Sequence, residues 1–372
     1  MALKKFLIRS CAVLLLAGLL AVGLAPVGVA AGLRLWFAWM ARHQGLQIDA
    51  GPIEAPLWRP AVLHRLRIAS QPDANFQVHA EVERVEVALN LAAIFSRARG
   101  RIFRSLAMDG LVLNIRRNPQ PTAASHGSAW PILENLLADN FQFSGVQLHI
   151  ENGTTLFDLH DGALSAGEIG PGVFTAREIA VRSPWLHQNF SQLRGAASWQ
   201  ESRLTLGAIT LARGLDFETI GFDLSHLGES RLGLEMNLDA FGGKVRARIS
   251  SDDHGNKRTW DMAGTASEIS LAQMSDALGW TDRASGSLRA CKFTFRGELA
   301  KIGDATATLW AEVTGLTWRD RTADTIMIGT SLYNREVQVQ QLYIKQHNNQ
   351  LTLTGQSALP QKWSDWLNPD FR

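Results

Sequence analysis

The chain is poor in the residues that cross-link a protein or give it charge. Of its 372 residues only two are cysteine, Cys11 and Cys291, and only two are tyrosine. Cys11 lies in an apolar amino-terminal segment, so we expect no structural disulfide between the two. Charged residues make up 19% of the chain, which is low for a soluble globular protein. The formal net charge of +2 favours no nucleic-acid partner.

Catalytic signatures are missing from the sequence as well. It contains no G-x-S-x-G nucleophile elbow, no phosphate-binding P-loop, no G-x-G-x-x-G fingerprint and no H-E-x-x-H zinc motif. The segment 162–167 (GALSAG) has the wrong spacing for a nucleophile elbow. We therefore predict a protein that is not an enzyme and needs no cofactor.

One group of potential metal ligands is present: Asp158, His160 and Asp161, with His149 nearby in the sequence. Aspartate and histidine side chains can together hold a metal ion. On strand alternation Asp158 and His160 share one face, as on a solvated strand, and Asp161 followed by Gly162 is typical of a turn. We predict an exposed strand end without a metal, and a metal-dependent envelope hydrolase is the alternative.

Glycine is abundant, with 32 residues, and apolar residues alternate with polar ones along much of the chain. The clearest case is the segment 203–250, where each alternating run predicts a strand with one apolar face. Breaks at Gly207, Gly214, 225–230 and Gly242-Gly243 indicate turns between the runs. The alternating residues are Leu204, Leu206, Ile209, Leu211, Leu215, Phe217, Ile220, Phe222, Leu224, Leu232, Leu234, Met236, Leu238, Ala240, Val245, Ala247 and Ile249.

The Gly242-Gly243 break predicts a register for the hairpin around it. A two-residue Gly-Gly turn is favoured because both positions need a positive φ. The pairs that follow are Ala240–Val245, Leu238–Ala247 and Met236–Ile249 on the apolar face, and Asp239–Arg246 and Asn237–Arg248 on the polar face. Both faces are chemically consistent, so we predict an antiparallel hairpin with one apolar side.

Similar alternation elsewhere predicts about 20 short strands, and an open sheet of that size curls or splits. A phase change at Glu83-Arg84 indicates a bulge. Short helices are predicted at 91–99, 130–138 and 271–278, the last of them capped by Ser270. The fold class is therefore mainly β, with a long curled antiparallel sheet forming a groove. A closed sandwich is the alternative, because the same alternation also builds the core of a sandwich.

The amino-terminal segment 11–33 has no charged residue, and a helix of that length can cross a hydrocarbon core of about 30 Å. Lys4, Lys5 and Arg9 precede it, which predicts a cytoplasmic amino-terminus. A cleaved signal peptide is the alternative, and either reading exports the rest of the chain. The predicted parts are a cytoplasmic end (1–9), a transmembrane helix (10–33), an amino-terminal β subdomain (34–116), a linker (117–129) and an extended antiparallel β domain (130–372).

The chain resembles the AsmA-like family, the group of bridge-like lipid transfer proteins that includes TamB. Five stretches carry the resemblance after the apolar amino-terminal segment: "PLWRPAVLHRLRIAS", "FQVHAEVERVEVALNLAAIF", "IFRSLAMDGLVLNIRR", "ISLAQMSDALGW" and the following "GSLRACKFTFRGEL". The late "LYIKQHNNQLTLTGQSALP" is similar in style. The resemblance implies an anchor in the bacterial inner membrane, a periplasmic β-groove and a role in envelope lipid or outer-membrane protein traffic.

Taken together, these features predict a single-pass inner-membrane protein whose periplasmic groove holds phospholipid acyl chains. The alternative is a scaffold that uses exposed strand edges to assemble outer-membrane or other envelope proteins. The candidate groove residues are Leu204, Leu206, Leu232, Leu234, Met236, Leu238, Val245, Ile249, Phe293 and Phe295.

Overall fold

The structure is a computed structural model, and most of the residues that it describes lie in β-strands. The described residues are 30–32, 34–35, 38–39, 41, 46–56, 59–71, 76–90, 101–118, 137–167, 170–183, 187–254, 257–280 and 282–359. They form two compact units. Unit 1 contains the strands β1 to β8 and most of β9, and unit 2 contains β10 to β20. The predicted mainly β fold is confirmed.

The strands of unit 1 are β1 (Leu46–Ala50), β2 (Ile53–Glu54), β3 (Ala61–Ser70), β4 (Phe76–Leu89), β5 (Phe103–Asp109), β6 (Val112–Arg117), β7 (Ala138–Asn152), β8 (Thr155–Gly167) and β9 (Gly172–Arg182). β3 pairs with β1, β2 and β4, and β4 then pairs along one edge with both β5 and β6. β7 runs parallel to β5 and β6, which departs from a purely antiparallel sheet. β5 and β6 together therefore act as one interrupted strand between β4 and β7.

The interruption between β5 and β6 belongs to a line of irregularities across unit 1. In β3 and β4, Arg65 and Glu83 lie opposite each other between regular pairs, and Arg65 has a φ of 57°. Gly110, at the break, and Gly145, in β7, have φ values of 66° and 62°, and Asp161 in β8 has 52°. Each insertion moves the apolar residues of its strand to the other phase. Neighbouring strands change phase at adjacent positions, so their apolar residues stay on one side of the sheet. The predicted bulge at Glu83-Arg84 is the irregularity of β4 in this line.

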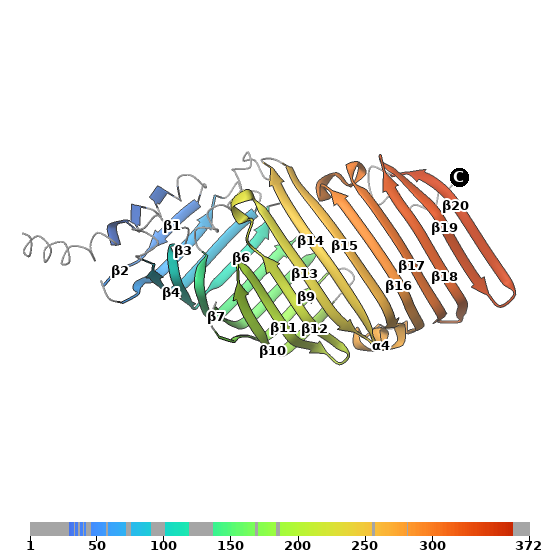
Figure 1. Ribbon diagram of the computed structural model, residues 1–372, viewed down its shortest axis with the longest axis horizontal. Helices are drawn as coiled ribbons and strands as arrows, with labels where there is room; N and C mark the ends of the chain where they lie inside the picture. Colours follow the sequence, from blue (N-terminus) through green and yellow to red (C-terminus); the bar gives the residue numbers. More distant parts are fainter. Residues whose placement is uncertain are drawn as a thin grey trace, which may run out of the picture. The chain divides into compact units, whose positions relative to one another are not determined.

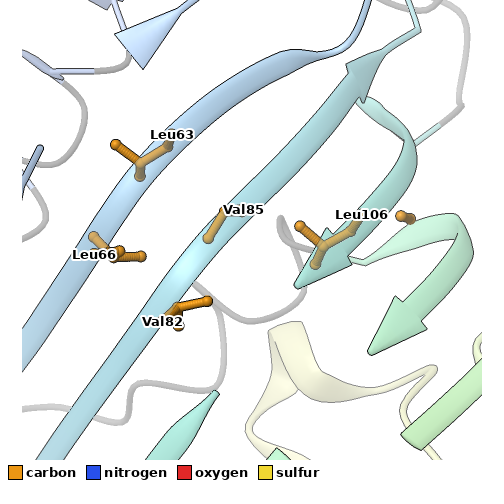
Figure 2. Packing of buried hydrophobic residues seen from close by; sticks show 6 residues of the cluster. Leu63, Leu66, Val82, Val85 and Leu106 are labelled. Atoms are coloured by element: carbon orange, nitrogen blue, oxygen red, sulfur yellow. The ribbon is translucent and has the colours of Figure 1, made fainter. Parts of the chain in front are cut away.

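The apolar side of β3 to β5 in unit 1 forms a buried core. Its cluster consists of Leu63, Leu66, Val82, Val85, Leu106 and Ala138, each less than 9% exposed. Figure 2 shows Leu63 and Leu66 on β3, Val82 and Val85 on β4, and Leu106 beyond them. Ala50 of β1 and Ile53 of β2 pack against this cluster. The apolar side chains of β1 to β5 and of the start of β7 therefore pack together in one core.

The strands of unit 2 are β10 (His187–Gln200), β11 (Arg203–Ala212), β12 (Leu215–Asp223), β13 (Arg231–Ala240), β14 (Gly243–His254), β15 (Lys257–Ser270), β16 (Ala284–Gly297), β17 (Thr306–Trp318), β18 (Arg321–Tyr333), β19 (Glu336–Gln346) and β20 (Asn349–Ala358). Each strand pairs antiparallel with the next one in the sequence. Figure 1 shows β13 to β20 side by side in chain order. Unit 2 is therefore a sequential meander.

The predicted turn at Gly207 is wrong, because β11 runs straight through this position. Ala208 has a φ of 53° and lies opposite Glu218 as an inserted pair between Gly207–Thr219 and Ile209–Phe217. A bulge therefore produces the phase change from Leu206 to Ile209 that the sequence attributes to a turn. The breaks at Gly214 and 225–230 do separate strands.

The predicted hairpin is present, but its register is wrong by two residues. The turn residues are Phe241 and Gly242, with φ values of 51° and 85°, and Ala240 pairs with Gly243. Leu238 then pairs with Val245, Met236 with Ala247 and Leu234 with Ile249, while Asp239 faces Lys244, Asn237 faces Arg246 and Glu235 faces Arg248. A shift by two residues keeps every side chain on its predicted face.

Two local features explain the shift of the turn. Phe241 is only 5% exposed, and it packs in a cluster with Ala240 and Ile269. Gly243 is needed inside the strand, because a Cβ there would lie 2.1 Å from the carbonyl oxygen of Ser267. Gly243 thus permits the close approach of the β14 and β15 backbones, and the turn is formed by Phe241 and Gly242.

The predicted helix at 271–278 is confirmed as α4 (Leu271–Ala277), and the Ser270 hydroxyl accepts a hydrogen bond from the amide of Gln273. Short 3₁₀ helices, η1 (Leu227–Glu229) and η2 (Leu299–Asp304), accompany it. The predicted helix 91–99 and most of 130–138 and of the linker 117–129 lie outside the described residues, although Ala138 begins β7. Within the described ranges, no helix is long and apolar enough to span a bilayer.

Candidate functional site

The register of unit 2 aligns its apolar side chains into rows that cross the strands. One row passes through Leu204, Phe222, Leu234, Ile249, Met262, Phe295, Ala307, Leu332 and Val337. A second contains Leu206, Ile220, Met236, Ala247, Gly264, Phe293 and Leu309. A third contains Leu238, Val245, Ala266, Cys291, Ala311, Ile328, Leu342 and Leu353. These rows define what we call the apolar face of unit 2.

All ten residues predicted for a groove lie in β11, β13, β14 or β16 of this face. Nine of them belong to the three rows, and Leu232 is two residues beyond Leu234 on the same side of β13. Sequence reasoning did not single out Met262, Leu309 or Ile328, which continue the same rows. Their strands alternate as clearly as β13 does, so the register with β14 and β16 is the signal that identifies them.

Burial on the apolar face is greatest at β10 and β11 and least at β20. Trp199 of β10 is 1% exposed, and Leu206 of β11 is buried as well. The groove candidates in β13 and β14 are half-buried, as is Phe295 of β16. Exposure then rises to 36% at Phe293, 40% at Leu309 and 53% at Leu351. Among the described residues, none covers the middle of this face as completely as the cluster residues of unit 1 are covered.

One border of the apolar face is covered by α4. Met274 and Ala277 of the helix pack on Phe241 and Ile269, together with Leu288 of β16. Figure 1 places α4 at the ends of β15 and β16, which it connects. The buried Ser275 hydroxyl fixes the helix by hydrogen bonds with the amide and the carbonyl of Ala284, at 3.1 and 3.3 Å. The helix therefore covers the strand ends and leaves the central rows uncovered.

Two residues in the centre of the face show its apolar character. The Phe293 ring lies directly over Gly264, where a Cβ would come within 2.2 Å of a ring carbon. Cys291 is a free cysteine in the third row, and partial burial raises the pKa of its thiol. A thiol that stays protonated at neutral pH acts here as a small apolar side chain.

The opposite face of unit 2 carries charged residues joined across strands. The Lys244 ammonium lies 2.8 Å from a carboxylate oxygen of Glu218 and 3.0 Å from one of Asp239. The hydrogen bond to Glu218, followed by that to Asp239, raises the pKa of Lys244. Arg203 and Arg248 both approach Glu235. These exposed pairs indicate a face that lies in water.

The predicted metal ligands Asp158, His160 and Asp161 lie in β8 of unit 1, and Asp158 belongs to a polar row. This row joins His79, Asn114, His149 and Asp158 of neighbouring strands, beside a cavity of about 490 Å³. Nδ1 of His149 lies 2.5 Å from Oδ1 of Asp158, while Asp161 takes up the positive φ of the β8 irregularity. Within the described ranges, no three side chains of His, Cys, Asp or Glu converge in a way that could hold a metal ion.

Comparisons with protein-family models, with curated proteins and with solved structures gave no match to this chain.

Proposed function

We propose that the apolar face of unit 2 holds the acyl chains of phospholipid, with the headgroups in water. The observation that supports this proposal is the set of three continuous apolar rows that remain half-exposed from β13 onward. Exposed apolar surface that is contiguous over many strands marks a site for an apolar ligand or partner. An acyl chain matches such a surface, because it offers length without polar groups.

The face suits a ligand that moves. Burial of each CH₂ group contributes about 0.8 kcal/mol, and this attraction has no preferred direction. The rows present leucine, isoleucine, methionine and phenylalanine side chains along their length, and none of the ten groove candidates is polar. A chain that slides from one row to the next exchanges equivalent contacts. The surface can thus retain lipid and still let it pass along the meander.

The remaining parts of the proposal come from the sequence. The uncharged segment 11–33 is proposed to anchor the chain in the bacterial inner membrane, with the rest in the periplasm. The resemblance to AsmA-like proteins supports a role in phospholipid transport or outer-membrane homeostasis. The proposal includes no catalytic step and no cofactor.

The test compares two adjacent substitutions on opposite faces of β16. Phe293→Asp places a carboxylate on the apolar face, whereas Lys292→Asp places one on the charged face, and both positions are exposed. The full chain is extracted gently and analysed by native mass spectrometry for bound phospholipid. We expect phospholipid on the natural chain and on Lys292→Asp, and a severalfold loss on Phe293→Asp at unchanged circular dichroism.

Two results would contradict the proposal. The first is a natural chain that carries no phospholipid. The second is a folded Phe293→Asp chain that carries as much as the control. Crosslinks to a polypeptide at a strand edge, with none to lipid along the apolar face, would instead favour the scaffold that assembles envelope proteins.

A further inference from the structure

The last strand of the meander, β20 (Asn349–Ala358), is exposed at every residue. Among the described strands it pairs with β19 alone, so one of its edges carries main-chain amide and carbonyl groups with no neighbouring strand. Leu351 and Leu353, which are 53% and 48% exposed, continue the apolar face to this edge. The edge is therefore able to accept another strand.

β20 lacks the features that normally prevent strand addition. Its ten residues, NQLTLTGQSA, include no charged residue and no proline. The bulge in this hairpin lies in β19, which has one extra residue between Val339 and Leu342 compared with the paired segment from Gly355 to Leu353 in β20. Proteins usually protect a free edge with lysine, proline or a bulge in the edge strand itself. An uncharged, regular strand of this length indicates an edge that is used.

We propose that two copies of this chain pair through β20, antiparallel, about a two-fold axis perpendicular to the sheet. Side chains directly opposite each other in an antiparallel pair lie on the same side of a sheet. A pair centred on Thr352 places Leu351 opposite Leu353 of the second copy, and Leu353 opposite Leu351 of the second copy. Thr352 then faces its own counterpart, and both apolar faces lie on the same side.

A second copy suits this edge for two reasons. A two-fold contact brings a strand against itself, which a charged edge opposes by like-charge repulsion and the uncharged β20 permits. The contact also continues the rows of Leu351 and Leu353 into identical rows, so these exposed leucines gain apolar neighbours. The inference goes beyond lipid binding, because the pairing needs no lipid.

The first test is a cysteine scan of the full chain. The natural cysteines are replaced by Cys11→Ser and Cys291→Ser, and single cysteines are introduced from position 350 to 356 and oxidised. Around a two-fold axis, the residue on the axis meets its own counterpart at Cβ distances of about 4.5–5.5 Å, and residues on either side do not. We expect disulfide-linked dimers to peak at one position in β20, with a control cysteine at Thr308 in β17 remaining monomeric.

The second test uses charge. Thr352→Lys places two lysines face to face, so we expect the dimer measured by light scattering to dissociate at severalfold higher protein concentration. Mixing Thr352→Lys with Thr352→Glu chains should restore pairing as a heterodimer, whereas Thr308→Lys should leave the natural dimer unchanged. A natural chain that is monomeric and shows no peak in the scan would overturn the proposal. Crosslinks from β20 exclusively to a different polypeptide would overturn it as well.

Discussion

In unit 1 the apolar side of β3 to β5 is buried, whereas in unit 2 the apolar side from β13 onward remains largely half-exposed. Leu66 of β3 is 7% exposed among the cluster residues of β3, β4 and β5, while Leu234 of β13 is partly accessible. Both leucines come from strands with the same alternation of apolar and polar residues. The alternation therefore specifies that a face is apolar, and the neighbouring elements decide whether this face becomes a core or a surface.

The difference in burial determines whether an apolar residue contributes mainly to the stability of the fold or to the binding of a ligand. A buried leucine contributes to the free energy of unfolding through close packing with its neighbours. A half-exposed leucine contributes less to folding and keeps accessible area that a ligand can bury. The buried cluster thus stabilises unit 1, whereas the apolar rows of unit 2 are available for the proposed lipid.

The largest expected effect comes from placing the same charge on the two faces. Leu66→Asp puts a carboxylate into the buried cluster, and we expect a loss of about 4 kcal/mol in the free energy of unfolding, enough to disrupt unit 1. Leu234→Asp should cost about 1–2 kcal/mol, because that position remains partly in water, and should lower the amount of bound phospholipid. Denaturant unfolding and native mass spectrometry measure the two effects. Equal loss of stability in both variants would abolish the distinction between the faces.

A medium effect is expected at two bulge glycines, Gly110 in unit 1 and Gly315 in unit 2. Their φ values are 66° and 58°, so alanine is strained at both, at about 1 kcal/mol. A Cβ at Gly110 would also lie 2.6 Å from Cγ of Glu83, whereas Gly315 has nothing within 4 Å. We expect Gly110→Ala to lower the melting temperature more than Gly315→Ala. The reverse order would show that the line of irregularities in unit 1 tolerates change better than its crowding indicates.

The smallest effect concerns the polar side of unit 2, where ion pairs and hydrogen bonds lie in water. The Ser225 hydroxyl donates to Asp223 at 2.6 Å and is the largest cause of a lowered pKa of that carboxyl group. A carboxyl group whose pKa is lower in the folded state stabilises the fold above its unfolded pKa and loses this contribution as the pH falls through the folded value. We expect Ser225→Ala to raise the pKa of Asp223 toward 3.8 in an NMR titration, with a small loss of stability at neutral pH. An unchanged pKa would assign the shift to the Ser225 amide, which also donates to Asp223.

Alternation alone predicts most of the strands, and Ser270 before Leu271 predicts α4 from the chemistry of its cap. Alternation does not distinguish a turn from a bulge, because both change the phase. β11 therefore looks like two short strands in the sequence although it is one strand with an insertion at Ala208. The parallel pairing of β7 with β5 and β6 also leaves no local trace, since it depends on contacts between distant segments.

The hairpin of β13 and β14 shows how a correct face can accompany an incorrect register. Glycine at two successive positions suggests that both serve the turn, but Gly243 is required by the approach of β15, which is distant in sequence. The buried Phe241 takes the turn position for the same tertiary reason. The predicted apolar face is nevertheless correct, because a shift by two residues preserves the side of the sheet on which Leu234, Met236 and Leu238 lie.

Because β10 to β20 pair strictly in chain order, the number of strands in the sheet can change without altering its topology. Because each strand depends on its two neighbours, a hairpin can be gained or lost within the series while the register of the others is kept, much as in proteins built from repeats. Evolution could set the distance over which the apolar rows run by changing the number of hairpins, with no need to redesign a shared core.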